Sequence, residues 1–328
     1  MGKSSRFKRH RRLSAPVSKK AAPKLSLDSD TQLAYYLVLV SDVLGQRSRL
    51  RALKDLPNSP DEMQAAIRVL KDTVGVVMFW RQGFRDFLAA WGRHSPFFER
   101  LPPHVKDAMH RALSCSISLR QFSDSVVMSV CLLDDNCEGC NTLSGVLGAL
   151  LAACGMHALS LCGKHPMRGG VDVGLGMPLP ESDIYGPALE RAVYLEGEVA
   201  GYPRIAVGAE LANYLDSMAA RPVASPFGTL AKHFAQASRR LLFTDTDGVV
   251  ALDFLGEEFH AHDGNLVLGE ILPDAFRFVR TTQLSCHEQK DQKLRERYDM
   301  LWAYFRSRAR IWGVTIERLA EELEGDPI

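Results

Sequence analysis

One uncharged segment restricts the folds open to this chain more than any other feature. Residues 143–162 run for twenty positions without Asp, Glu, Lys or Arg, which is enough to cross a bilayer as a helix. Three glycines, His157 and Ser160 interrupt the segment, which lies in mid-chain between charged residues. Small residues let a helix approach a strand layer closely. We therefore predict a buried helix packed on a β-sheet, and no membrane span.

Segments with strand and helix periodicity alternate on both sides of this helix. We expect strands at 31–41, in a hairpin around Asp124, at 167–177 and in a second hairpin at 241–254, and helices at 60–91, 105–113, 186–199 and from near His287 onwards. A short strand and helix are expected within 206–217. With 328 residues, 46% of them hydrophobic, the chain can bury a sizeable core. The pattern predicts an α/β (α+β) sandwich with helices flanking a mainly antiparallel sheet.

The charge of the chain is divided unevenly. Residues 1–24 hold nine Lys or Arg and no acid, so residues 25–328 sum to −8 in a chain of net charge +1. No apolar stretch of a secretory signal follows these cations. We predict a disordered basic arm over 1–28 and a cytoplasmic protein. Such an arm attracts phosphates, but nucleic acid is an unlikely partner because no aromatic residues are interleaved to stack on bases.

Cysteine and histidine give little support for a structural metal site. Seven scattered cysteines indicate a reducing compartment. Cys137 and Cys140 have the spacing of a zinc or redox motif, yet no second pair follows at a matching distance. His260 and His262 are similarly isolated, and we interpret residues 260–263 as a polar loop.

Two aspartates each end or interrupt an apolar, strand-like run. Asp42 follows residues 35–41, and Asp124 lies between residues 116–123 and 125–130. Taken singly, each is explained as a turn or capping residue. Placed side by side, two carboxylates suit a pair of Mg²⁺ or Mn²⁺ ions, which clamp the attacking and leaving oxygens in phosphoryl or nucleotidyl transfer.

Four stretches of the chain occur in the order seen in class III nucleotide cyclases. They are Leu39–Gly45, Phe122–Val127, Arg168–Gly174 and Ile184–Ala192. The chain most resembles bacterial anti-phage pyrimidine cyclases of the Pycsar type, in which residues 202–205 also have a counterpart. The resemblance covers roughly residues 33–305. It implies a cyclase catalytic domain at 29–240, with a C-terminal hairpin and helix at 241–328 packed on it.

The resemblance also implies a reaction and the residues that perform it. It implies that UTP is converted to 3′,5′-cyclic UMP and pyrophosphate, with two manganese or magnesium ions held by Asp42 and Asp124. Arg191 is the expected transition-state arginine, supplied across a head-to-tail homodimer. The product would act on a cyclic-nucleotide-gated effector. The Asn expected four residues before Arg191 is replaced by Pro187, and a shifted alignment puts Glu190 and Tyr194 at these two positions.

Several alternatives stay open at this point. CTP, giving cyclic CMP, is the alternative substrate, because one buried polar side chain decides between uracil and cytosine. Arg168 and Arg204 are further candidates for contacting phosphate, since the guanidinium fork pairs with phosphate oxygens. The missing Asn favours a different class of protein, a non-catalytic cyclase-like domain that binds a nucleotide as a sensor.

Overall fold

The computed structural model describes residues 33–51, 53, 56–90, 115–122, 124–133, 137–179, 184–263, 268–289 and 291–317. Residues 32–328 form one compact unit, and residues 1–31 are a separate unit. The predicted basic arm at 1–28 and the predicted helix at 105–113 lie outside the described residues. The division of the chain at residue 240 stays a prediction.

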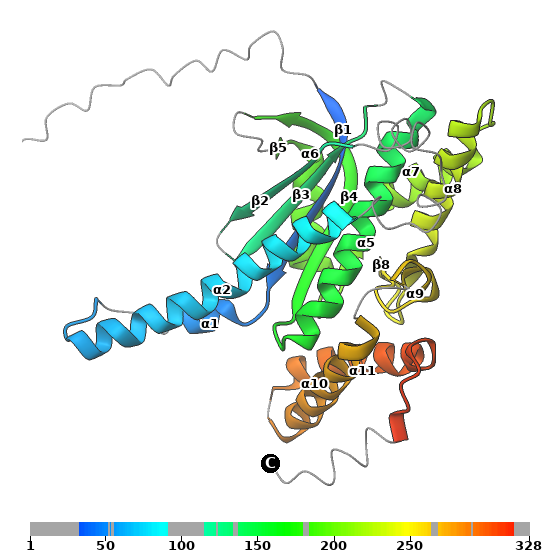
Figure 1. The fold of residues 1–328 in the computed structure, drawn as a ribbon. Coiled ribbons are helices and arrows are strands. Elements are labelled where there is room, and N and C mark those ends of the chain that lie inside the picture. Colours follow the sequence, from blue (N-terminus) through cyan, green and yellow to red (C-terminus); the bar gives the residue numbers. More distant parts are fainter. Residues whose placement is uncertain are drawn as a thin grey trace, which may run out of the picture. The chain divides into compact units, whose positions relative to one another are not determined.

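An eight-stranded sheet forms the centre of the described part of the chain (Figure 1). Seven strands follow the order β2-β3-β1-β4-β6-β8-β7, and β5 pairs with β4 off this path. Among the described strands, β4 and β6 pair in parallel and the other pairs are antiparallel. The strands are β1 (Ala34–Val43), β2 (Ile117–Phe122), β3 (Ser125–Cys131), β4 (Met167–Pro178), β5 (Ile184–Tyr185), β6 (Ile205–Val207), β7 (Leu242–Thr244) and β8 (Val250–Leu252). The predicted mainly antiparallel sheet, flanked by helices, is confirmed.

Strand β1 is central because helices cover both of its faces. Leu37 and Leu39 belong to the large core with α5 (Cys140–Cys162) and α2 (Pro60–Ala90). Val38 and Val40 point the other way, into a smaller cluster with α6 (Pro187–Tyr194). Burial on both faces explains why this strand reads as a nearly continuous apolar run.

Helix α5 is the predicted buried helix. It is long and apolar enough to cross a membrane, but 89% of its most apolar window is buried inside the protein. Its small residues permit close packing on α2, since a Cβ added to Gly155 would lie 2.3 Å from Cζ of Phe87. The predicted packing of this segment on other elements is confirmed.

The C-terminal third contains more helix than the sequence indicated. Three helices were not anticipated, α8 (Pro226–Arg240), α9 (Glu257–Asp263) and α10 (Leu268–Glu288). The expected strand and helix at 206–217 are found as β6 and α7 (Ala209–Ala220). The expected hairpin forms from β7 and β8, and Gly248 at its turn has a φ of +83°, which glycine tolerates without strain.

One interpretation of this region was wrong, and one helix starts later than expected. Residues 260–263 are not a polar loop but belong to helix α9 (Glu257–Asp263), in which His260 packs edge-on against Trp312. The helix expected from near His287 is present but begins later, at Gln292. Helix α10 ends at Glu288, and α11 (Gln292–Arg308) starts after Asp291, whose side chain accepts a hydrogen bond from the backbone N–H of Leu294 at 3.0 Å. An N-cap of this kind sets a helix start that apolar spacing alone does not reveal.

Candidate functional site

Asp42 lies near the C-terminal end of β1, on the face of the sheet that α6 partly covers. It is 4% exposed. Its neighbour across the strand pair is Ser125 of β3, whose hydroxyl donates a hydrogen bond to Oδ1 of Asp42 at 3.1 Å. This bond orients one carboxylate oxygen of a side chain that is largely removed from water.

Asp124 occupies the turn between β2 and β3, directly beside Asp42. The backbone N–H of Val43 donates to the carbonyl oxygen of Asp124 at 3.2 Å. Asp124 is half-buried. The hairpin therefore brings together two aspartates that are more than eighty positions apart in the chain, at one end of the sheet. The two residues are neighbours in the backbone, whereas the side-by-side placement of their carboxylates and metal binding by them stay predictions.

The donor set suits a hard divalent cation. Both aspartates offer oxygen ligands, and Mg²⁺-type sites often use only one or two protein carboxylates together with substrate phosphates. In the described part of the chain, no group of three or more His, Cys, Asp or Glu side chains could hold a metal ion by itself. The pair thus fits ions that arrive with a polyphosphate substrate better than a permanent structural metal.

The turn after Asp42 is held at both ends. The backbone N–H of Leu44 donates to the carbonyl of Pro166 at 2.8 Å. Gly45 has a φ of +85°, and no atom lies within 4 Å of the place where its Cβ would be. The chain then enters α1 (Gln46–Arg51), where the buried amide of Gln46 donates to the carbonyl of Thr73 in α2 at 3.3 Å. Gly45 adopts its positive φ without strain.

An ion pair lies on the other side of Asp42. Arg168 of β4 is the register partner of Asp42, and its Nε lies 2.6 Å from Oε1 of Glu196. Glu196 belongs to a π-helix, η3 (Leu195–Val199), that continues α6. Such π-helical turns are frequent at functional sites. Directly opposite side chains in a sheet have Cβ atoms about 4.5–5.5 Å apart, so Arg168 is the candidate arginine placed next to Asp42 within one chain.

The π-helix approaches the sheet at a glycine. A Cβ on Gly170 would lie 2.3 Å from the carbonyl oxygen of Ala192 and 2.6 Å from the backbone nitrogen of Glu196. Glycine at this position therefore permits the close contact between β4 and η3. Gly170 therefore contributes to the site through packing.

The side chain of Arg191, the preferred transition-state arginine, points towards β4 of its own chain. Its Nη1 donates to the carbonyl of Val173 at 3.0 Å. Val173 lies five residues along β4 from Arg168, a distance of about 17 Å in an extended strand. Arg191 is therefore remote from Asp42 within one chain. Glu190 and Tyr194, the pair of the shifted alignment, are both exposed on α6, with Tyr194 57% exposed.

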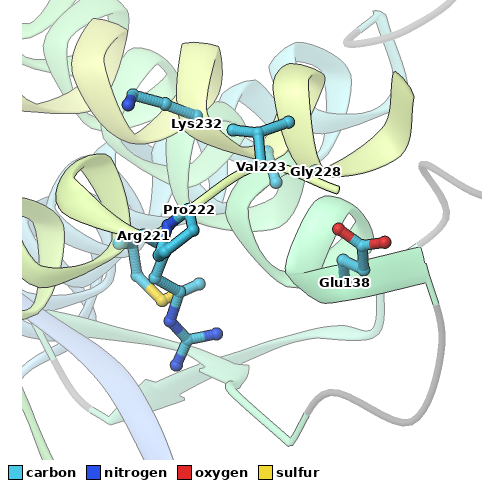
Figure 2. Close-up of a pocket in the computed structure, with 8 residues that line it drawn as sticks. Glu138, Arg221, Pro222, Val223, Gly228 and Lys232 are labelled. Atoms are coloured by element: carbon cyan, nitrogen blue, oxygen red, sulfur yellow. The ribbon is translucent and has the colours of Figure 1, made fainter. Parts of the chain in front are cut away.

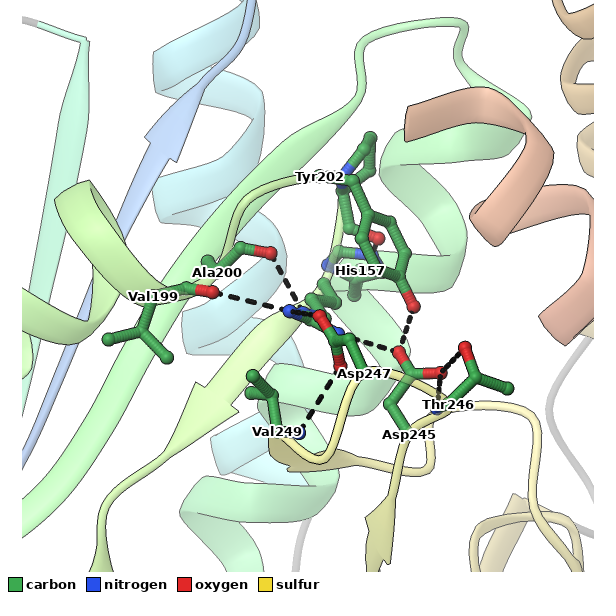
Figure 3. A network of polar contacts seen from close by, with 10 residues as sticks. His157, Val199, Ala200, Tyr202, Asp245, Thr246, Asp247 and Val249 are labelled. Carbon is green, nitrogen blue, oxygen red and sulfur yellow. Dashed lines mark hydrogen bonds and ion pairs between the residues drawn. The ribbon is translucent and has the colours of Figure 1, made fainter. Parts of the chain in front are cut away.

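Arg204 has a structural role, because its guanidinium is held by two carboxylates of its own chain. Its guanidinium lies 2.7 Å from Oδ2 of Asp245 and 2.6 Å from Oδ2 of Asp247 (Figure 3). It also stacks over the Tyr202 ring, and the Tyr202 hydroxyl donates to Asp245. Bidentate, buried arginine contacts of this kind fix geometry. Arg204 clamps the β7–β8 turn against the segment before β6, so we remove it from the candidates for contacting phosphate.

Sequence reasoning missed one candidate, Arg120 of β2. Arg120 pairs with Val127 of β3, two residues from Ser125, which pairs with Asp42. Partners across strands share a face, and so do residues two apart. Arg120 therefore shares the face of Asp42, four positions before Asp124. Side chains alternate between the two faces of a strand. Following this alternation from Asp42 across the pair to Ser125 and Val127, and on to β2, would have identified Arg120.

A cavity of about 230 Å³ lies elsewhere, between α7, α8 and the loop that precedes α5 (Figure 2). Its charged lining residues are Glu138, Arg221 and Lys232. None of the residues predicted for the site lines this cavity. The cavity therefore does not support the hypothesis of a site at Asp42 and Asp124.

Comparisons with known proteins add little to this geometry. No family model matches the chain, and no curated protein matches it. Among solved structures, a bacterial light-regulated adenylyl cyclase matches at 15% sequence identity and a TM-score of 0.29. The match covers 56% of this chain and 45% of that one. A TM-score of this size carries no weight for function.

Proposed function

We propose that this chain is a nucleotide cyclase that converts a nucleoside triphosphate to its 3′,5′-cyclic monophosphate and pyrophosphate. The observation that carries the proposal is the backbone hydrogen bond of Val43 to Asp124, which places Asp124 close to Asp42 at one end of the sheet. The Asp42 carboxylate is oriented by Ser125 at 3.1 Å. The resemblance of the surrounding segments to class III cyclases is the second support.

The proposed reaction is an in-line displacement at phosphorus. The ribose 3′-oxygen forms a bond to the α-phosphorus, the bond from that phosphorus to the bridging oxygen breaks, and pyrophosphate leaves. The proton of the 3′-hydroxyl is released to solvent. Two bound Mn²⁺ or Mg²⁺ ions would supply charge stabilisation for both oxygens. Asp42 and Asp124 would hold these ions, and Arg168, fixed by Glu196 at 2.6 Å, is placed to balance phosphate charge.

A pyrimidine substrate is the finer part of the proposal, and UTP is preferred to CTP. The resemblance to pyrimidine cyclases suggests the class of base. In this proposal Arg120, on the face of Asp42, contacts the base, and a guanidinium only donates hydrogen bonds. Uracil presents a carbonyl acceptor at the ring position where cytosine presents an amine donor. In this proposal the cyclic product serves as a messenger for a separate cyclic-nucleotide-gated effector in anti-phage defence, as the resemblance implies.

The proposed active unit is a head-to-tail homodimer with two equivalent sites. Arg191 of one chain would serve the carboxylates of the other, since it lies far from Asp42 in its own chain. Tyr194 is the alternative, because its side chain is exposed on α6 while Arg191 contacts Val173. A non-catalytic nucleotide sensor is the second candidate function. It is favoured by Pro187, which stands at the start of α6 where an Asn is expected.

The test is to incubate the purified protein with ATP, GTP, CTP and UTP separately in Mn²⁺ and to identify products by mass spectrometry. Cyclic UMP is expected, with rates at least about a hundredfold lower in Asp42→Asn and Asp124→Asn. Asp72→Asn, at an exposed position of α2, is the matched control and should keep full activity. Absence of any cyclic product from a folded protein that binds a nucleotide would support the sensor.

A further inference from the structure

Helix α2 carries a second apolar surface besides the one that packs on the core. Thr73, Val77, Trp80 and Phe84 form its buried side. Another stripe, which we call the α2 stripe, consists of Met63, Ile67, Leu70, Val74 and Met78. Apart from the half-buried Ile67, its members are 46%, 50%, 50% and 60% exposed in that order. The spacing of three or four residues places all five on one side of the helix.

The stripe lies on a part of α2 that projects from the sheet. Figure 1 shows the N-terminal half of α2 continuing beyond the strands, while its C-terminal half lies over β3 and α5. The stripe spans about 22 Å along the helix axis at 1.5 Å per residue. An exposed apolar surface of this length is unusual on a soluble protein and marks an interaction site.

Charges on α2 are sorted around the stripe. Rotation of about 100° per residue puts the exposed Lys71 and Arg85 beside the stripe. The same rotation puts Asp61, Asp72 and Asp86, together with one cation, the exposed Arg68, on the opposite half of the helix. The partner of the stripe should therefore combine apolar character with negative charge.

An anionic lipid surface meets these requirements better than a protein partner. A convex helix face fits a protein only where that partner offers a groove, whereas a bilayer interface takes up an apolar helix face directly. Pairing of two copies about the middle of the stripe would bring their Lys71 side chains together, which costs energy through like-charge repulsion. Residues 1–24 add nine cations and no acid to the same chain, and a basic segment together with an apolar helix face is the combination that gives stable interfacial binding.

We propose that the α2 stripe binds the chain peripherally to bilayers rich in anionic phospholipid. In this arrangement Leu70, Val74 and Met78 enter the acyl boundary, and Lys71 and Arg85 contact lipid phosphates. Binding needs neither nucleotide nor turnover. It is therefore independent of the proposed cyclase activity.

The experiment is flotation of the full-length protein with vesicles of phosphatidylcholine alone or mixed with phosphatidylglycerol. Binding is expected for the mixed vesicles only, and it should weaken with salt. Leu70→Glu/Val74→Glu should lower the bound fraction about tenfold. Phe79→Glu is the matched control, because Phe79 is 56% exposed on the other side of the same helix, and it should bind like the unmodified protein. Lys71→Glu/Arg85→Glu should remove the preference for anionic lipid.

Circular dichroism of each variant checks that the helix is intact. Equal binding by the Leu70→Glu/Val74→Glu variant and the unmodified protein would overturn the proposal, since the basic N-terminal residues would then suffice. Equal binding to both vesicle types would also overturn it. A third contrary result is a dimer in sedimentation that the same double variant abolishes, with no vesicle binding, because the stripe would then be an interface between copies.

Discussion

At the scale of single residues, the site depends on the burial and the neighbouring groups of one carboxylate, that of Asp42. Asp42 is almost removed from water and accepts a hydrogen bond from Ser125. A buried charge is costly unless it is paired or coordinates a metal. The ion pair of Arg168 with Glu196 lies beside Asp42 on the same face. Asp42 therefore lies next to groups of both charge signs.

A second buried residue, His157, makes the stability of the protein depend on pH. Its Nε2 lies 3.3 Å from the carbonyl oxygen of Pro203, and its ring packs on Phe254. Burial lowers the pKa of His157 to about 3. The unfolded chain, with an ordinary histidine pKa of about 6.5, therefore binds a proton that the folded chain excludes. Stability contributed by the neutral ring is present above pH 6.5 and is lost as the pH falls towards 3.

We predict that His157→Gln removes this part of the pH dependence. Between pH 6.5 and 5 the unmodified protein should lose about 2 kcal/mol of unfolding free energy through His157. The Gln variant keeps an N–H donor for Pro203 but does not titrate, so its loss over that range should be smaller by this amount. Urea unfolding at the two pH values measures the difference. Identical losses in both proteins would show that His157 is not the responsible group.

At the scale of elements, the contact of η3 with β4 sets the position of Glu196. A methyl group on Gly170 would meet backbone atoms of Ala192 and Glu196 at 2.3 and 2.6 Å. We predict that Gly170→Ala lowers the unfolding free energy by about 1–3 kcal/mol, the usual cost of overpacking. It should also displace Glu196 from Arg168 and reduce turnover more than substrate binding.

The matched control for this prediction is Gly75→Ala. Gly75 lies in α2 and has no atom within 4 Å of its Cβ position, so alanine should stabilise the protein by about 0.5–1 kcal/mol. Thermal and urea unfolding give both values. If Gly170→Ala were as stable as the unmodified chain, the close approach of η3 to β4 would not be required.

Much of this element structure could be predicted, because periodicity reports burial. The apolar run before Asp42 and the uncharged helix α5 were identified since each lies between packed layers. The helix at 260–263 and the start of α11 could not be predicted from apolar spacing, because local caps and the contact of His260 with Trp312 decide them. The proximity of the two aspartates followed from the hairpin. The contacts of Arg204 and Arg191 could not be foreseen, because they depend on which carbonyls and carboxylates the tertiary fold brings near each guanidinium.

At the scale of the whole molecule, the proposed activity needs two chains. The carboxylates lie at one end of β1, whereas Arg191 contacts Val173 about 17 Å further along β4. Within one chain, the carboxylates and Arg191 are therefore too far apart to act on the same substrate. A two-fold dimer can bring the carboxylates of one copy to α6 of the other.

We predict that two inactive variants regain activity when mixed. Asp42→Asn lacks the carboxylate and Arg191→Ala lacks the arginine, so neither homodimer contains an intact site. In an equal mixture that exchanges subunits, half of the dimers are mixed and each of these has one intact site out of two. About a quarter of the original turnover is therefore expected, measured as cyclic nucleotide formed per total protein.

The same mixing identifies the residue that α6 supplies. Tyr194→Ala replaces Arg191→Ala in a parallel experiment, because Tyr194 is exposed on that helix while Arg191 is tied to Val173. Recovery with one variant only, together with full loss in that variant alone, assigns the role to its residue. Asp42→Asn mixed with Asp124→Asn is the control and should stay inactive, because both substitutions damage the same half of the site. Activity of a dilute monomer, or recovery in that control, would contradict a site shared between two chains.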